Sequence, residues 1–318
     1  MSLKVDGVEV GTTPMLIPAV SSKLNVKIAY LLETVEEVVN GPFLLSSYDY
    51  YYSGKPRVSF PDLIFLDSGG YECNRDRDIT DIGMYNPSPK KWKERNHKAV
   101  IDDWDFTIPT SIISFDHPSI RENLDRQIAR AKKLYPEGRN FLKELLIKPE
   151  TTGSSKVNID SIAGRVNSLS HFNIIGFTEK ELGSSILDRM ISIATVRKIL
   201  DRANLSVPIH IFGSLDAVTT PLYFMSGADI FDGLSWLRFL FHGGNAHYID
   251  SIGPMIFGIS ENVKKTWIRS VYQNYSYMQK LRLDMEKFCD TQDFAIFRDN
   301  GEFFRESLSY LDTRMGVE

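Results

Sequence analysis

Short apolar runs recur along the chain, and stretches with helical spacing lie between several of them. Each run is rich in Ile, Leu and Phe and is bounded by Gly, Pro, Asp or Ser, a pattern typical of strands that are buried on both faces. The runs are residues 15–20, 43–46, 63–66, 111–115, 141–147, 172–177, 209–212 and 229–231. The pattern therefore predicts a parallel sheet enclosed by helices.

Amphipathic helices are expected where apolar residues recur every three or four positions. Residues 119–133 place Ile120, Leu124, Ile128 and Ala131 on one side, with charged residues opposite. The same spacing occurs in residues 184–200 and, over a shorter stretch, in residues 215–225. Residues 260–288 are rich in Lys, Arg, Tyr, Met and Leu and predict one or two further amphipathic helices.

The alternation of strands and helices predicts a (β/α)8 TIM barrel more strongly than an open doubly wound sheet. Such barrels usually take about 250 residues, which residues 15–236 nearly supply. No GxGxxG motif follows the first apolar run, which weakens the dinucleotide-binding alternative. We expect a barrel with an N-terminal extension over residues 1–240 and a helical C-terminal extension over 241–318, packed together as a single domain.

The composition is that of an ordinary globular protein. The chain has 318 residues, of which 42% are hydrophobic and 25% charged, and this excludes a disordered chain or a small disulfide scaffold. Its two cysteines, Cys73 and Cys289, form no CxxC motif, which argues against a Cys-rich zinc site. Neither a signal peptide nor an apolar run of about 18 residues is apparent, so we expect a cytoplasmic protein that does not span a membrane.

The charge balance excludes a general basic footprint for nucleic acid. Lys and Arg total 37 against 41 Asp and Glu, a formal charge of −4. The densest basic clusters lie in residues 90–98 and 126–133, and such runs are more often solvated faces than binding sites. Any polynucleotide surface must therefore be local, or shared with another chain.

Three carboxylates follow buried runs at the ends where barrel enzymes carry their chemistry. Asp67 is followed by Ser68 and two glycines, Asp116 follows Phe115, and Asp232 follows Phe231. One aspartate at a strand end is more often a helix cap or a turn former. Three aspartates at one rim, two of them beside glycines, predict a catalytic or binding site instead.

A pair of carboxylates suits substitution at the anomeric carbon of a sugar. One carboxylate attacks the carbon and holds the sugar covalently, while the other donates a proton to the departing group. The spacing of the residues does not give the distance between the carboxylates, so at this point the pair supports a hypothesis about the class of reaction only.

Two motifs stand out: Leu-Asp-Ser-Gly-Gly-Tyr at residues 66–71, and Asp-Ile-Phe-Asp at residues 229–232 followed by Arg238. They resemble the DSGG(F/Y) and D-x-F-D-x5-R motifs of the tRNA-guanine transglycosylase family, which has relatives that exchange bases in DNA. Weaker matches, in the family's order, are Thr-Pro-Met at 13–15 with Pro18, Ser-Phe-Asp at 114–116, Phe-Gly at 212–213 and the stretch 273–283.

This resemblance implies specific roles. Asp232 would be the nucleophile at C1′ of the target guanosine, and Asp67 would be the general acid for the leaving base and the base for the incoming one. The substrate-binding residues would be Asp116, which accepts hydrogen bonds from the purine, the aromatic sandwich of Tyr71 and Phe212, Gly176 at the base edge, and Ser68 and Arg238 as substrate or phosphate contacts. No cofactor is implied.

The chain also departs from the family. The family's zinc ligands, three closely spaced cysteines and a histidine, have no counterpart here, so we expect no metal and no zinc subdomain. A glutamine that the family places after its fifth strand is replaced by Lys148-Pro149-Glu150, and an asparagine after the second strand by Ser46-Ser47. Base selection is therefore expected to differ, and the departures favour the DNA-modifying relatives.

The resulting expectation is a transglycosylase that exchanges guanine in DNA or tRNA, DNA being favoured, for a free 7-deazaguanine base. Its partners would be the nucleic acid and the free base, and a homodimer or a partner protein is left open. Two alternatives remain: a catalytically silent barrel that binds nucleic acid or a partner subunit, and a retaining glycoside hydrolase.

Overall fold

The computed structural model describes residues 1–73 and 89–316. The strands are β1 (Ser2–Val5), β2 (Val8–Thr12), β3 (Met15–Pro18), β4 (Phe43–Ser46), β5 (Ile64–Asp67), β6 (Thr110–Ile113), β7 (Leu142–Ile147), β8 (Ile174–Thr178), β9 (Ile209–Phe212), β10 (Ile230–Gly233), β11 (Phe239–His242) and β12 (Asn245–Tyr248). The helices are α1 (Ile28–Val35), α2 (Ser47–Tyr52), α3 (Gly70–Cys73), α4 (Glu94–Asp103), α5 (Leu124–Leu134), α6 (Ile159–Ala163), α7 (Ile186–Arg202), α8 (Thr219–Met225), α9 (Ser235–Arg238), α10 (Ile249–Phe257), α11 (Val263–Thr291) and α12 (Gly301–Met315).

Strands β3 to β10 form one eight-stranded sheet in the order β3-β10-β9-β8-β7-β6-β5-β4. Every strand pair with a resolved register in this sheet is parallel. The sheet is nearly closed into a barrel, and helices follow most of its strands. The expected α/β TIM-barrel-like fold is therefore confirmed.

The chain divides into two compact units, each described here by itself. The N-terminal unit comprises Ser2–Gly11 and Ala19–Gly176, and the C-terminal unit comprises Met1, Thr12–Pro18 and Phe177–Glu318.

In the N-terminal unit, β5 lies between β4 and β6. All four residues of each of these strands are buried, which is why the sequence shows continuous apolar runs rather than alternation. Leu66 of β5 is in register with Leu45 and Ile112, and the next position pairs Asp67 with Ser46. The register therefore fills the sheet with apolar side chains and places polar ones at the carboxyl ends of β4 and β5.

In the C-terminal unit, β10 lies between β3 and β9. Phe231 is in register with Leu16 and Ile211, and Asp232 with Ile17. Asp232 is thus the one charged side chain in an otherwise apolar strand that is buried throughout.

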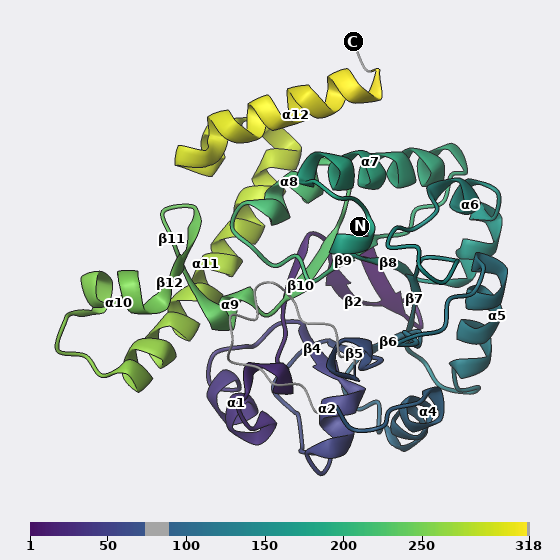
Figure 1. The fold of residues 1–318 in the computed structure, drawn as a ribbon, viewed down its shortest axis with the longest axis horizontal. Helices are drawn as coiled ribbons and strands as arrows, with labels where there is room; N and C mark the ends of the chain where they lie inside the picture. The colour runs from purple at the N-terminus through teal and green to yellow at the C-terminus, as the bar shows by residue number, and fades with distance from the viewer. Residues whose placement is uncertain (74–88, 317–318) are drawn as a thin grey trace. The chain divides into compact units, whose positions relative to one another are not determined.

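The sequence led us to expect a helical extension after β10, but this extension also contains two strands. An antiparallel hairpin, β11–β12, turns at Gly243 and Gly244, and it packs on α11. The side chain of Asn274 from α11, which is fully buried, accepts from the Phe241 N–H at 2.7 Å. Residues 263–291 form one continuous helix, and α12 packs against α7 and α8 (Figure 1).

The helix expected from residue 119 begins at Leu124 instead. His117 Nδ1 accepts from the N–H groups of Ser119 and Ile120, which forms a turn there, and Asn123 caps the helix by accepting from Arg126 N–H at 3.0 Å. Ile120 is consequently outside the helix and exposed. Among the helices of residues 1–73 and 89–316, none is long and apolar enough to cross a membrane.

Candidate functional site

The N-terminal unit places Asp116 directly against Gly70. Asp116 follows β6, and Gly70 begins α3 just after β5. A Cβ added to Gly70 would lie 2.7 Å from Asp116 Cβ and 2.8 Å from its Oδ2. Only a glycine therefore lets the Asp116 carboxylate approach this backbone, which explains the second glycine of the Asp-Ser-Gly-Gly motif.

The first glycine of the motif serves a tight turn. Gly69 has φ +83°, and a Cβ there would lie 2.5 Å from Tyr48 Cβ. Asp67, which is 9% exposed at the end of β5, accepts from the Gly69 N–H through Oδ2 at 2.9 Å. The motif thus holds Asp67 in a defined orientation, with one oxygen used by the turn.

The Ser68 side chain binds the backbone of Asp116. The side chain is fully buried, and its Oγ accepts from the Asp116 N–H at 3.1 Å, while its carbonyl accepts from Trp92 Nε1 at 2.7 Å. In this structure Ser68 therefore fixes the backbone of Asp116 and has no exposed surface of its own.

Two cations face the Asp116 carboxylate. Lys148 Nζ lies 3.1 Å from Oδ2, and Arg121 Nη1 lies 3.8 Å from Oδ1. The exposed fractions of the Lys148 and Asp116 side chains are 11% and 18%. Oδ1 of Asp116 is buried and has no hydrogen-bond partner among the described residues, so the charge of Arg121 is its nearest compensation.

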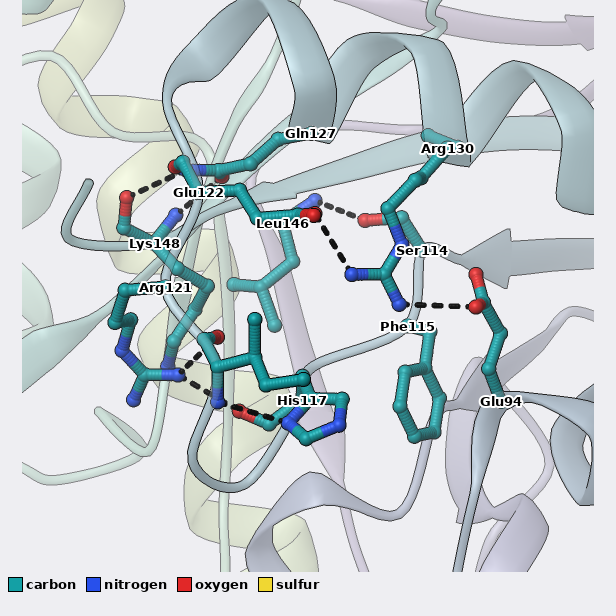
Figure 2. Close-up of a pocket in the computed structure, with 12 residues that line it drawn as sticks. Glu94, Ser114, Phe115, His117, Arg121, Glu122, Gln127, Arg130, Leu146 and Lys148 are labelled. Atoms are coloured by element: carbon teal, nitrogen blue, oxygen red, sulfur yellow. Dashed lines mark hydrogen bonds and ion pairs between the residues drawn. The ribbon is translucent and has the colours of Figure 1, made fainter. Parts of the chain in front are cut away.

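Lys148 is held in place by α5. The Gln127 side chain accepts from the Lys148 N–H at 2.9 Å and donates to the Lys148 carbonyl at 3.0 Å (Figure 2). Glu150 accepts from the Leu124 N–H at 3.0 Å and so joins the same loop to the first turn of that helix. The lysine therefore sits on a loop that is fixed by hydrogen bonds to α5.

The cavity beside Lys148 is small. It is lined by Ser114, Phe115, His117, Arg121 and Lys148, among others, and its volume is about 30 Å³ (Figure 2). A water molecule needs about 10–15 Å³ of such space, so this cavity has room for ordered solvent.

Two buried carboxylates, Glu72 and Asp49, lie close to the Asp-Ser-Gly-Gly motif. Burial raises the pKa of Glu72 to about 7, the nearby charge of Asp49 adds to the rise, and hydroxyl donors from Ser21 and Ser46 oppose it. Burial likewise raises the pKa of Asp49 to about 6, hydrogen bonds from Ser22 oppose the rise, and the charge of Asp67 adds to it. These groups form a proton-binding cluster next to the Asp-Ser-Gly-Gly motif.

A buried histidine joins the elements around β6. His97 of α4 lies 2.9 Å from Ser47 Oγ through Nδ1 and 3.0 Å from the Ile113 carbonyl through Nε2. Burial lowers its pKa to about 4, so the imidazole is neutral and its Nε2–H donates to the carbonyl.

Tyr71 and Gly176, both predicted to contact the purine base of the substrate, also lie in the N-terminal unit. Tyr71 on α3 is 36% exposed, and Lys23 Nζ lies 3.9 Å from the centre of its ring. Gly176 is buried within β8.

The C-terminal unit holds Asp232 in a second polar cluster. Asp232 Oδ1 accepts from the Gly213 N–H at 3.2 Å and lies 3.3 Å from Nε2 of the fully buried His210. The His210 ring stacks on Phe212 with 4.0 Å between centroids. Asp232 is 7% exposed, so its carboxylate is oriented and largely dehydrated.

Arg238, the last predicted site residue of this unit, ends α9. No group of three or more His, Cys, Asp or Glu side chains within residues 1–73 and 89–316 is arranged to hold a metal ion. Burial, followed by the charges of Glu72, Asp116 and Asp67, raises the pKa of Cys73 to about 12, so this thiol stays protonated.

The structure thus gathers Asp67, Ser68 and Asp116 in the N-terminal unit, and Phe212 and Asp232 in the C-terminal unit. Sequence reasoning missed Glu72, Asp49 and His210. Glu72 directly follows the motif and His210 lies two residues before Phe212, yet nothing in the pattern marks their burial. No model of a known protein family matches this chain, and no curated protein matches it either.

Proposed function

We propose that this protein exchanges guanine in a polynucleotide for a free 7-deazaguanine base, with DNA favoured over tRNA as the substrate. The observation that carries the proposal is the position and burial of the Asp232 carboxylate. Its carboxylate lies at the carboxyl end of a parallel strand, is 7% exposed, accepts a hydrogen bond from the Gly213 N–H and lies 3.3 Å from His210 Nε2. A dehydrated, oriented carboxylate is suited to attack at an anomeric carbon.

In the first half of the reaction, an oxygen of Asp232 forms a bond to C1′ of the target nucleoside as the bond from C1′ to N9 of guanine breaks. Asp67 donates a proton to the departing base, which leaves neutral. The sugar remains attached to Asp232 as a covalent ester, and its configuration at C1′ is inverted.

In the second half, N9 of the incoming base attacks C1′ and displaces Asp232. Asp67, now a carboxylate, takes the N9 proton, so both aspartates return to their starting states. Two inversions retain the original configuration at C1′. Asp116 accepts hydrogen bonds from the base, as an ionised carboxylate can only accept them.

The test compares the incorporation of radiolabelled guanine into tRNA and into duplex DNA by the wild type and Asp232→Asn. The wild type is expected to incorporate label and to form a denaturation-resistant complex with the polynucleotide, and Asp232→Asn is expected to do neither. Asp290→Asn, at an exposed position on α11, is the matched control and should retain both properties. Exchange by Asp232→Asn at the wild-type rate would refute the proposed role.

The remaining outcomes separate the alternatives. Salt-sensitive binding of nucleic acid with no exchange by the wild type would favour a silent binding barrel. Release of free sugar from a simple glycoside, without dependence on a base, would favour a glycoside hydrolase.

A further inference from the structure

A short cationic segment of the N-terminal unit lies between the Asp-Ser-Gly-Gly motif and α4. Residues 90–95, which we call the basic segment, carry four exposed cationic side chains: Lys90, Lys91, Lys93 and Arg95. The one carboxylate of the segment, Glu94, is paired with Arg130 of α5 at 2.9 Å. None of the four cations forms an ion pair with a residue in 1–73 or 89–316. Their charge is therefore not compensated by this part of the protein.

The tyrosines of α2 hold the backbone of the basic segment. The Tyr48 hydroxyl accepts from the Lys90 N–H at 2.8 Å, and the Tyr52 hydroxyl donates to the Lys91 carbonyl at 2.7 Å. A segment that is fixed in this way loses little conformational freedom when a ligand binds. The cations are thus presented on an ordered backbone.

Trp92 joins the basic segment to the motif. It is 6% exposed, and its Nε1–H donates to the Ser68 carbonyl at 2.7 Å. The flanking Lys91 and Lys93 are exposed, and the backbone at Lys93 is extended, so successive side chains point to opposite sides. Two cations therefore lie beside the one residue of the segment that contacts the motif of Asp67.

Aromatic rings accompany these cations. Tyr51 of α2 is 38% exposed, and its ring centre lies 5.7 Å from that of Trp92. Lys90 Nζ lies 4.5 Å from the centre of the Tyr52 ring. Cations attract phosphate groups, and an exposed aromatic ring offers a surface on which any base can stack. An acidic peptide would use the cations alone, so the combination favours a nucleic-acid strand.

On the basis of the proposed function, we infer that the basic segment and Tyr51 bind the single strand that flanks the target nucleoside. Lys91 and Lys93 contact its phosphate groups, and Tyr51 stacks on one of its bases. The chain as a whole has a formal charge of −4, so a local cationic surface is needed to attract a polyanion. Contacts of this kind position a strand without reading its sequence.

The test measures, by fluorescence anisotropy, the binding of a labelled oligothymidylate of about 16 nucleotides between about 50 and 200 mM salt. This probe contains no guanine, so its binding does not depend on exchange. Each phosphate that is neutralised on a single strand contributes about 0.7 to the slope of log K against log salt concentration. The double variant Lys91→Met/Lys93→Met should therefore lower the slope by about 1.4 and weaken binding at 200 mM salt by about 10-fold.

Two further variants separate charge from stacking. Tyr51→Leu should weaken binding by about 10-fold and leave the slope unchanged, because stacking releases no counterions. Lys132→Met/Lys133→Met is the matched control, since it removes two exposed cations in the last turn of α5. That turn lies about 16 Å along the helix from its first residue, Leu124. The control should keep the affinity and the slope of the wild type.

The outcomes separate this inference from the proposed reaction, because guanine exchange is measured in the same preparations. An unchanged slope in Lys91→Met/Lys93→Met, or an equal loss in the control, overturns the inference, whether or not the wild type exchanges guanine. A loss confined to Lys91→Met/Lys93→Met, without exchange by the wild type, supports the inference and overturns the reaction. Displacement of the probe by polyaspartate at equal charge concentration would assign the surface to an acidic peptide instead. If the double variant does not fold, Lys91→Met and Lys93→Met decide singly, each with an expected fall in slope of about 0.7.

Discussion

Replacing Gly70 with alanine tests whether the placement of Asp116 matters for activity. Gly70 does not have a positive φ, so alanine can adopt its backbone conformation. The new Cβ would lie 2.7 Å from Asp116 Cβ, whereas carbon atoms in contact prefer about 3.5–4.0 Å. The Asp116 side chain must therefore move by about 1 Å.

Two effects of different size follow from this displacement. Forcing an extra methyl into a packed site typically costs about 1–3 kcal/mol of the free energy of unfolding. A misplacement of about 1 Å in a binding group can cost about 100-fold in rate. We therefore expect Gly70→Ala to lose about 100-fold in the kcat/KM of guanine exchange while the protein remains folded.

The assay pairs guanine exchange with urea unfolding. Gly164→Ala is the matched control, because its Cβ would meet only the Ser161 carbonyl at 3.8 Å, an ordinary contact. This control should keep wild-type exchange and gain about 0.4–1 kcal/mol of stability, because alanine lowers the entropy of the unfolded chain. Wild-type exchange by a destabilised Gly70→Ala would refute the reasoning, since Asp116 would then tolerate displacement.

Two further predictions concern the buried side chains Glu72, close to the Asp-Ser-Gly-Gly motif, and His210, beside Asp232. Glu72 has a pKa that rises from 4.5 to about 7 on folding, so its contribution to stability is present below pH 4.5 and is lost as the pH rises through 7. Glu72→Gln should therefore flatten the pH dependence of urea unfolding between pH 5 and 8 by on the order of 3 kcal/mol, and a slope equal to that of the wild type would contradict the burial argument. His210→Phe keeps a ring that can stack on Phe212 and removes the nitrogen beside Asp232. It should lower the kcat of exchange about 10- to 100-fold with little change in KM, and an equal rise in KM instead would show that His210 acts on substrate binding.

Much of the barrel was predictable from local patterns. Buried parallel strands must be apolar along their whole length, so residues 43–46 and 209–212 were predicted with the bounds that the structure has. The Gly243-Gly244 turn is a recognisable hairpin signal that could have revealed β11–β12, but the flanking strands are short and carry no alternation strong enough to stand out.

The start of α5 was not predictable from periodicity alone. The apolar spacing continues through Ile120, but hydrogen bonds from two backbone N–H groups to His117 stabilise a turn before the helix. A side chain that accepts hydrogen bonds from backbone N–H groups keeps those residues out of the helix, even where the apolar spacing predicts that the helix continues.

By itself, the sequence determined the alternation of strands and helices and the place of Asp67, Asp116 and Asp232 at the strand ends, because both depend on neighbours along the chain. Only the tertiary structure decided which groups surround these aspartates. Lys148 and Asp116 come from different strand ends, and Glu72, Asp49 and His210 owe their protonation or orientation to burial among distant segments. Dehydration and charge pairing depend on distances through space, which the order of residues does not specify.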